Sequence, residues 1–311
     1  MHISISSKRC KYELDIHGKY SVIGGDSGSG KSTLYKMIML WEAENKAIKA
    51  SCDYKLHAMA INENSSFLEN NEGCIIVIDE YCKILREPDI STILRKSKNY
   101  FILITRKILD FLPVSVDNYY EMKTSGIVHA NVPVYPRFKN RDYIGVKTIV
   151  TEDKRSGYLY FKDYYDCDVK SAHSKSEVVK YLIKNKLIDP SVLVVYDAAA
   201  FAYQAKSFYD FCNQYNVQVL DWESFEHEIL LNYPFNEKLT QDDSSYLYES
   251  LEQLSTCVLS NKIRYNKSSL TNCLKKEFTC DRCNRDCEFK HSRTKPRTFS
   301  INENIKNISA F

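Results

Sequence analysis

A glycine-rich stretch near the start of the chain has residue types and spacing that suit the binding of phosphate groups. The sequence from Gly25 to Ser32 reads G-x-x-x-x-G-K-S. Glycines allow the backbone to turn so that successive N–H groups point at phosphate oxygens. In such a loop Lys31 supplies a positive charge to the β- and γ-phosphates, and the Ser32 hydroxyl is a ligand for Mg²⁺. The residues expected to contact a nucleotide are consecutive: Gly25, Asp26, Ser27, Gly28, Ser29, Gly30, Lys31, Ser32 and Thr33.

A pair of acidic residues follows a strongly apolar run further along the chain. The four β-branched residues 75–78 lead into Asp79 and Glu80, which predicts a buried parallel strand with carboxylates at its end. Asp79 is expected to hold Mg²⁺, directly or through water, and Glu80 to orient and deprotonate the attacking water. A carboxylate beside that water favours hydrolysis over phosphoryl transfer to another substrate. The sequence therefore predicts ATP and Mg²⁺ as ligands, with Glu80 and Lys31 as the catalytic residues.

These residues require particular elements around them. Tyr20–Ile23 predicts a short strand that enters the loop. After the loop, apolar residues recur at helical spacing: Leu34, Met37, Ile38 and Trp41. A second buried strand is predicted at Phe101–Ile104, and ligands in α/β sheets lie at the carboxyl ends of the strands. Thr105 or Arg106 could therefore sense the γ-phosphate, or could face solvent or another element.

The loop and the acidic strand, in this order, resemble the Walker A and Walker B motifs of P-loop nucleoside triphosphatases. Predicted strands at Ile3–Ile5 and Tyr12–Ile16 form an antiparallel pair before the loop, which resembles the start of ABC-class ATPases. The resemblance implies an α/β fold with a mostly parallel sheet over residues 1–140, and ATP turnover. The chain contains no L-S-G-G-Q-type signature, which in that class completes the ATP site across a dimer. Assembly as a homodimer or with a partner protein therefore stays open.

Residues 141–235 are expected to form a second, smaller α/β domain. A polar run at 137–142 predicts the linker before it. Predicted strands at 146–150, 191–196 and 217–220 alternate with helical segments, a pattern typical of a parallel sheet. Acidic residues fall at the ends of these strands: Glu152, Asp153, Asp197, Asp221 and Glu223.

This order of strands and acids is similar to the Toprim domain of topoisomerases, primases and OLD-type nucleases. OLD-type proteins also join an ABC-like ATPase to a Toprim domain in that order. The resemblance implies a second Mg²⁺ site at Glu152, Asp153 and Asp197 for phosphodiester chemistry. The chain departs from the pattern, because Ala199 stands where the second acid of Asp-x-Asp is expected. Three alternatives stay open: Glu223 or Glu226 replaces the missing acid, the domain binds without cutting, or the acids are ordinary strand-end residues.

Residues 236–311 are expected to be a helical and basic tail. Residues 261–297 contain eleven Lys and Arg but four Asp and Glu, so this segment is a candidate contact for DNA or RNA, or a solvated surface. Within it, four residues with the spacing C-x₂-C-x₃-C-x₃-H could hold Zn²⁺: Cys280, Cys283, Cys287 and His291. Cys273 could replace one of these ligands, and reduced thiols without metal are the alternative.

The overall composition suits a globular protein without a membrane span. The 311 residues carry a net charge of +3, and no apolar run approaches the ~20 residues that cross a bilayer. No signal peptide is visible, which favours the cytoplasm and reduced cysteines. The sequence thus predicts an ATP-hydrolysing protein that controls a second domain acting on nucleic acid, with a Mg²⁺-dependent nuclease as one form. The alternative is a nucleotide-gated protein-interaction module.

Overall fold

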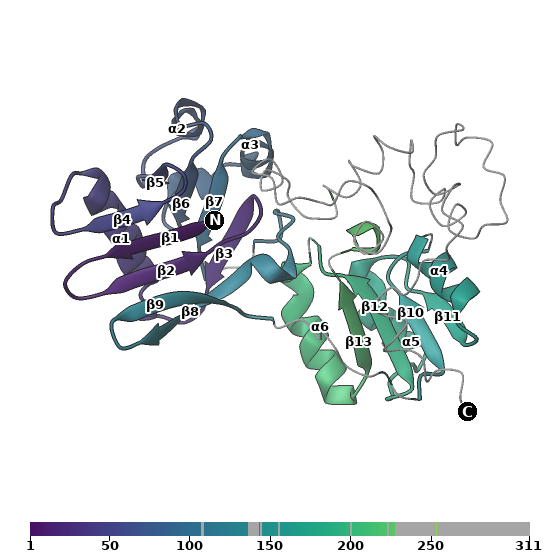
Figure 1. Ribbon diagram of the computed structural model, residues 1–311. Helices are drawn as coiled ribbons and strands as arrows, with labels where there is room; N and C mark the ends of the chain where they lie inside the picture. Colours follow the sequence, from purple (N-terminus) through teal and green to yellow (C-terminus); the bar gives the residue numbers. More distant parts are fainter. Residues whose placement is uncertain are drawn as a thin grey trace, which may run out of the picture. The chain divides into compact units, whose positions relative to one another are not determined.

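The computed structural model describes residues 1–106, 109–135, 143, 145–154, 156–199, 201–222, 224–227 and 253. The described residues divide into two compact units, one up to residue 135 and the other from residue 143 onward. Each unit has its own β-sheet (Figure 1). Of residues 236–311, Gln253 is the one position that is described. Within these described ranges, no helix has both the length and the apolar character that crossing a membrane requires.

The first unit is built on a nine-stranded sheet with the spatial order β4-β1-β2-β9-β8-β3-β7-β6-β5 (Figure 1). Its strands are β1 (His2–Ser6), β2 (Lys11–Asp15), β3 (Tyr20–Gly24), β4 (Lys49–Cys52), β5 (Leu56–Ala58), β6 (Ile75–Asp79), β7 (Tyr100–Ile104), β8 (Tyr119–Ser125) and β9 (Val128–Pro133). The described α-helices are α1 (Lys31–Glu42), α2 (Ser65–Asn70) and α3 (Ile90–Lys96), accompanied by the 3₁₀ turns η1 (Lys83–Arg86) and η2 (Val116–Asn118).

This sheet is mixed, so the predicted P-loop NTPase domain with a mostly parallel sheet is wrong. The neighbours β5, β6, β7, β3 and β8 run parallel to one another. However, β1 pairs antiparallel with β2 and β4, and β8 pairs antiparallel with β9. The reason is the length of the connections, because tight turns join β1 to β2 and β8 to β9, whereas a parallel pair needs a crossover of about a dozen residues. Gly126 takes a φ of +62° in the second turn.

Helix α1 packs against one face of this sheet through an apolar stripe. Leu34 and Ile38 are completely buried, and Tyr35 and Met37 are nearly so. Alternate residues of the strands supply the facing surface: Ile3, Ile5, Leu14, Ile23, Ile75, Val77, Ile102 and Ile104. Burying one such side chain contributes about 1.5–3 kcal/mol. This packing, more than helix propensity, stabilises α1 against the sheet at the end of the loop that follows β3.

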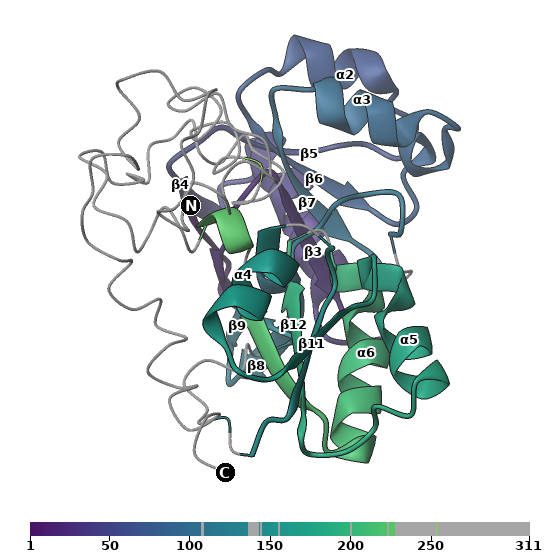
Figure 2. The same ribbon diagram turned by 90° about the vertical axis from the view of Figure 1, so that its right-hand side faces the viewer.

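The second unit contains a four-stranded parallel sheet with the order β11-β10-β12-β13. The strands are β10 (Thr148–Thr151), β11 (Asp168–Ser171), β12 (Val192–Asp197) and β13 (Gln218–Trp222). The described helices are α4 (Ser156–Tyr164), α5 (Val178–Lys184) and α6 (Ala202–Tyr215), with the 3₁₀ turn η3 (Lys175–Glu177). Figure 2 shows α4 on one face of this sheet and α5 and α6 on the other. The central strand β12 is buried along its whole length.

Candidate phosphate-binding site

The glycine-rich loop connects a fully buried strand to the first turn of a long helix. Strand β3 is buried at every position, and α1 begins at Lys31. Gly25, Gly28 and Gly30 have φ angles of +94°, +84° and +93°, which side-chain-bearing residues rarely adopt. Gly30 is the N-cap of α1, and no side chain in the described part of the chain caps the helix. The loop therefore presents backbone N–H groups and a helix N-terminus at one place, which suits a phosphate.

Lys31 closes this loop on itself. Its Nζ donates to the backbone oxygens of Gly25 at 2.8 Å and Asp26 at 2.7 Å, and to Ser29 Oγ at 2.9 Å. These bonds use all three donors of an ammonium group. Burial, followed by the nearby Arg106 guanidinium, lowers the pKa of Lys31, while neighbouring carboxylates act in the opposite direction. A bound phosphate would replace loop oxygens as the acceptor of these hydrogen bonds.

Two aromatic rings support the end of the loop at Gly30. The Tyr12 hydroxyl on β2 donates to the Gly30 carbonyl oxygen at 2.9 Å. His129 on β9 stacks on Tyr12, with ring centroids 4.5 Å apart and an interplanar angle of 13°. A Cβ atom added at Gly30 would lie 2.9 Å from the Tyr12 oxygen and 3.1 Å from His129 Nδ1. Sequence reasoning missed this support, because strands far apart in sequence supply it.

The strand register brings the acidic residues to the same edge of the sheet as the loop. Asp79, the last residue of β6, pairs with Ile104 on β7, and Ile104 pairs with Ile23 on β3. The carboxyl ends of the three neighbouring strands are therefore level with one another. Glu80 directly follows Asp79, and Arg106 follows β7 by two residues. The loop, the acids and this arginine thus meet at one sheet edge.

Asp79 is a buried carboxyl group whose surroundings suit a hard cation. It is 4% exposed, and its Oδ1 accepts the Tyr81 backbone N–H at 3.2 Å. Burial raises the pKa of Asp79, and the Glu80 carboxylate adds to this effect. A nearby cation would favour the charged form. Ser32 is exposed in the first turn of α1, so its hydroxyl is accessible to a ligand bound at the loop.

A complete metal cage made of protein side chains does not occur in the part of the chain that is described. Within it, no group of three or more His, Cys, Asp or Glu side chains could hold a metal ion. Mg²⁺ bound with a nucleotide usually takes one or two protein ligands, and phosphate oxygens and water complete its shell. Ser32 and Asp79 fit that smaller contribution.

Arg106 links the acidic end of β6 to the glycine loop. Its backbone N–H donates to Glu80 Oε2 at 3.2 Å, and its Nε lies 3.8 Å from Glu80 Oε1. Its Nη2 lies 3.5 Å from Ser27 Oγ. Thr105, the other residue considered as a sensor, is buried in the sheet, with its N–H bonded to the Ile23 oxygen. The Arg106 side chain therefore reaches the loop.

In the second unit, two of the predicted acidic residues lie at the carboxyl ends of neighbouring strands. The Glu152 backbone N–H donates to the Val195 oxygen at 3.2 Å, so the end of β10 is fixed beside β12. Asp197 is the last residue of β12, and its Oδ1 accepts the Phe225 backbone N–H at 3.2 Å. Both carboxyl groups are largely buried, with 9% exposure for Glu152 and 8% for Asp197.

The register of β12 and β13 separates Asp197 from Asp221. Tyr196 pairs with Asp221, and aligned residues on parallel neighbours point to the same side of the sheet. Tyr209 on α6 donates to Asp221 Oδ2 at 3.0 Å and also contacts the Tyr196 hydroxyl. Asp197 is the next residue along β12 and points to the opposite side. Asp221 therefore belongs to the packing of α6 on the sheet.

Asp153 has a clear role in local structure. Its two carboxylate oxygens accept the backbone N–H groups of Gly157 at 3.1 Å and Tyr158 at 3.0 Å, at the start of α4. This is the bonding of a helix N-cap. The Asp153 carbonyl oxygen accepts the hydroxyls of Thr151 at 2.8 Å and Ser171 at 2.7 Å. The sequence carries a signal for this role, since an acid stands just before a helical segment.

Several predicted residues lie outside the described ranges. They are the candidate zinc ligands Cys280, Cys283, Cys287 and His291, the alternative ligand Cys273, the acid Glu223 and the basic segment 261–297. Glu226 is described and is 1% exposed.

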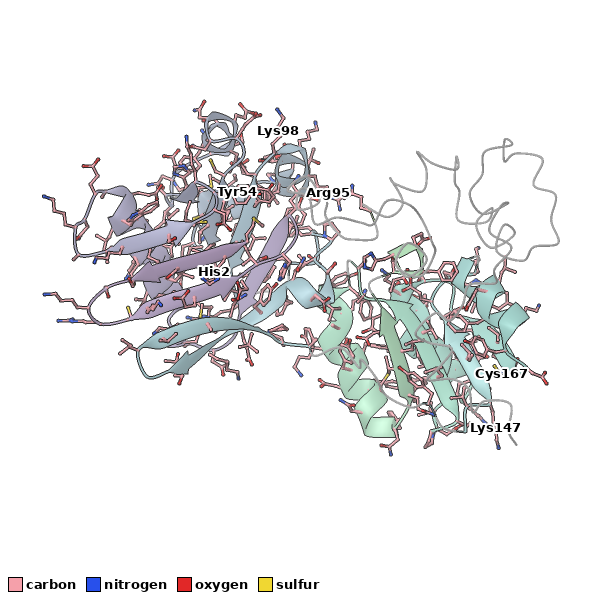
Figure 3. The ribbon with its side chains drawn as sticks, viewed as in Figure 1. His2, Tyr54, Arg95, Lys98, Lys147 and Cys167 are labelled. Atoms are coloured by element: carbon pink, nitrogen blue, oxygen red, sulfur yellow. The ribbon has the colours of Figure 1, made fainter. Side chains whose placement is uncertain are left out.

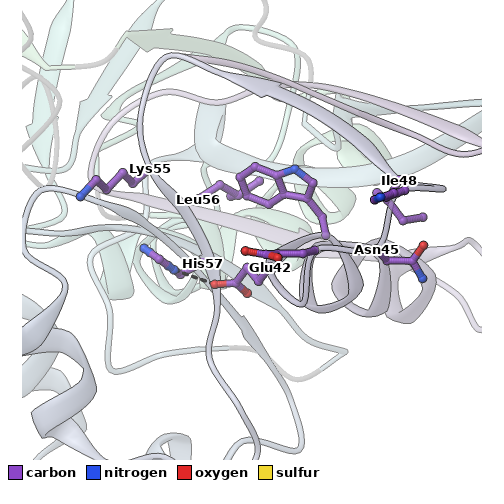
Figure 4. Close-up of a pocket in the computed structure, with 9 residues that line it drawn as sticks. Glu42, Asn45, Ile48, Lys55, Leu56 and His57 are labelled. Atoms are coloured by element: carbon purple, nitrogen blue, oxygen red, sulfur yellow. Dashed lines mark hydrogen bonds and ion pairs between the residues drawn. The ribbon is translucent and has the colours of Figure 1, made fainter.

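A pocket of about 570 Å³ lies at the C-terminal end of α1, which is the end opposite to the loop (Figure 4). Its wall includes Glu42, whose Oε1 lies 2.6 Å from His57 Nδ1 and whose Oε2 accepts the Ala58 N–H at 2.9 Å. This carboxylate joins the last turn of α1 to β5. None of the residues predicted from the sequence to bind nucleotide lines this pocket.

Comparison with known proteins adds no further constraint on the site. No family model matches the chain, and neither a curated protein nor a solved structure matches it.

Proposed function

We propose that this protein binds ATP with Mg²⁺ at the Gly25–Ser32 loop and hydrolyses it. The observation that carries the proposal is the common sheet edge shared by the glycine loop, the Asp79–Glu80 pair and Arg106. Three glycines with positive φ, a buried lysine and a helix N-terminus suit a polyphosphate. The acids beside them suit the metal and the attacking water.

Each side chain has a separate task in the proposed reaction. Lys31 transfers its hydrogen bonds from the loop oxygens to the β- and γ-phosphates. Ser32 and Asp79 hold the metal, which when bound neutralises charge that develops on the phosphates. Glu80 accepts a proton from the attacking water. Because its carboxylate is 20% exposed, a water can approach it.

The test compares the 311-residue chain with two site variants and one control variant. Wild type should release phosphate from ATP, and Glu80→Gln should bind ATP but hydrolyse it at least about 100-fold more slowly. Lys31→Met should lose tight ATP binding. Lys98→Ala is the matched control, because Lys98 is an exposed lysine of the same unit near the other end of β7 (Figure 3). ATP affinity that survives in Lys31→Met would show that the nucleotide binds elsewhere.

We propose further that the nucleotide state controls the second unit, which acts on or binds nucleic acid. Glu152 directly follows β10 and Asp197 ends the neighbouring strand β12, so both acids lie at the carboxyl edge of this sheet, where α/β folds bind their ligands. Cleavage of DNA or RNA with Mg²⁺ should then depend on Glu152, and Glu152→Gln should abolish it while ATP turnover continues. Wild type that leaves every DNA and RNA form intact would rule out the nuclease.

A specific observation favours the second candidate function, a nucleotide-gated interaction module. Asp153 caps α4, Asp197 accepts the Phe225 N–H, and Ala199 stands where a further acid would be needed. A protein partner captured with ATP but not with ADP would support this function. A partner bound equally in both nucleotide states would contradict the gating.

A further inference from the structure

Arg106 and Glu80 form an ion pair beside the glycine loop of the proposed ATP site. The pair joins Nε to Oε1 at 3.8 Å, and Nη2 of the same guanidinium lies 3.5 Å from Ser27 Oγ in the loop. The guanidinium therefore lies between the loop and the acid.

The two attachments of Arg106 to Glu80 differ in what can move. The backbone N–H bond to Oε2 is fixed by the end of β7 and does not depend on the side chain. The guanidinium contact is long, and the Arg106 side chain is 53% exposed, so little packing holds it in place. The arginine can leave Glu80 while the backbone keeps the carboxylate at the strand end.

The charges near the loop favour such a movement when a polyphosphate arrives. Lys31 and Arg106 repel one another, and this contributes to the lowered pKa of Lys31. A γ-phosphate carries more negative charge than one carboxylate and offers several acceptor oxygens to the planar guanidinium. When Arg106 exchanges Glu80 for a γ-phosphate, its guanidinium therefore gains a stronger charge interaction and more hydrogen bonds.

We infer that Arg106 is a γ-phosphate-responsive latch, which holds Glu80 Oε1 in the nucleotide-free protein and releases it to the attacking water when ATP binds. The inference rests on the proposed function and deepens it. It makes Arg106 the residue that distinguishes ATP from ADP. It also delays the freeing of the Glu80 oxygen until a γ-phosphate is present.

The test is a double-mutant cycle on nucleotide affinity. Wild type, Arg106→Ala, Glu80→Gln and the double variant are titrated with ADP and with the non-hydrolysable analogue AMP-PNP. Arg106→Ala should weaken AMP-PNP binding roughly tenfold, because a charged hydrogen bond to phosphate is lost. ADP affinity should stay within about twofold, whereas a merely structural role would move both affinities together.

The coupling between the two sites isolates the latch. Glu80→Gln should tighten AMP-PNP binding in both backgrounds, because it removes repulsion from the phosphate. The gain in AMP-PNP affinity should be about 2- to 5-fold larger when Arg106 is present than when it is alanine. In the Arg106 background, Glu80→Gln also removes the exposed ion pair that AMP-PNP must otherwise break. The control cycle uses the exposed pair of Glu72 and Lys98, with Nζ 3.0 Å from Oε2, and should show no coupling.

The outcomes separate the latch from the proposed function. Equal gains from Glu80→Gln in both backgrounds, with normal AMP-PNP binding, would overturn the latch alone. Equal weakening of ADP and AMP-PNP by Arg106→Ala would do the same. Wild type that binds neither nucleotide would overturn the proposed function and the latch together. Arg106→Lys, which keeps the charge, should recover part of the AMP-PNP affinity, and no recovery at all would count against the exchange.

Discussion

Replacing Gly30 with alanine should damage the first unit more than the same change at Gly28. Both glycines have positive φ, at +93° and +84°. Their surroundings differ, because a Cβ at Gly30 would lie 2.9 Å from the Tyr12 oxygen and 3.1 Å from His129 Nδ1. At Gly28 no atom of the described residues lies within 4 Å of an added Cβ. Gly28→Ala is therefore a matched control for the backbone cost.

The magnitudes follow from these contacts. A left-handed conformation costs an alanine about 1–2 kcal/mol at either position. At Gly30 the methyl group must also displace the buried Tyr12 hydroxyl from the Gly30 oxygen, which costs about 0.5–1.5 kcal/mol more. We expect a loss of about 1.5–3.5 kcal/mol for Gly30→Ala and about 1–2 kcal/mol for Gly28→Ala.

Urea unfolding measured by tryptophan fluorescence can resolve this difference. The chain has two tryptophans, and Trp222→Phe leaves Trp41, at the end of the helix that Gly30 begins. With a urea m-value of about 1–3 kcal/mol/M, a difference of about 1 kcal/mol separates the midpoints by about 0.3–1 M. Tyr12→Phe should reduce the cost of Gly30→Ala, because it removes the nearest atom. Equal midpoints for the two alanine variants would refute the reasoning.

Three ionisable side chains give the remaining predictions. Burial raises the pKa of Asp79, so its charge destabilises the free protein above that pKa, and Asp79→Asn should raise the urea midpoint at pH 7 without nucleotide or metal. This gain in stability should vanish as the pH falls below the ordinary pKa of a carboxyl group. The same Asp79→Asn variant should hydrolyse ATP at least about 100-fold more slowly than wild type. A urea midpoint lower than that of wild type at pH 7 would contradict the prediction. Asp153→Ala should cost about 1 kcal/mol in the second unit and Asp153→Asn less than half of that, whereas equal losses would argue against the cap. The hydrogen bond to Asp15, opposed by burial, raises the pKa of His2 above 6.5. Its stabilisation is therefore complete below about pH 6.5 and is lost as the pH rises through the folded value. Because His2 is 53% exposed (Figure 3), His2→Gln should cost only a few tenths of a kcal/mol at about pH 5.5 and nothing at pH 8.5. A constant difference across that range would exclude the ion pair.

Much of the structure of the phosphate loop could be predicted from local features of the sequence. The strand at Tyr20 and the helix after Lys31 lie where apolar spacing predicts them, because their signals are contained within a few residues. The same holds for the apolar strand that ends in Asp79. Glycine, strand and helix preferences are local properties, and the loop depends on little else.

Pairing between distant strands could not be predicted in the same way. β2 pairs parallel with β9, so Lys11 lies opposite Val128, although more than a hundred residues separate them. This pairing and the two antiparallel turns make the sheet mixed, and they also bring His129 onto Tyr12. The side chain of Arg106 reaches Ser27 for a similar reason, because β7 lies between β3 and β6. A pattern within one segment does not specify which segment will lie beside it.

A ligand of the loop must compete with loop oxygen atoms for the hydrogen bonds that Lys31 donates. A phosphate ligand must first replace the three oxygen atoms that already accept hydrogen bonds from the Lys31 ammonium group. A single phosphate group gains little binding free energy over these three oxygen atoms. A chain of phosphates also reaches the N-terminus of α1 and a second cation, Arg106. The loop should therefore grade ligands by the number of phosphate groups, so that inorganic phosphate and AMP fail to displace ATP at equal concentration. We therefore expect the hydrogen bonds of Lys31 within the loop to disfavour small anions that carry a single phosphate group.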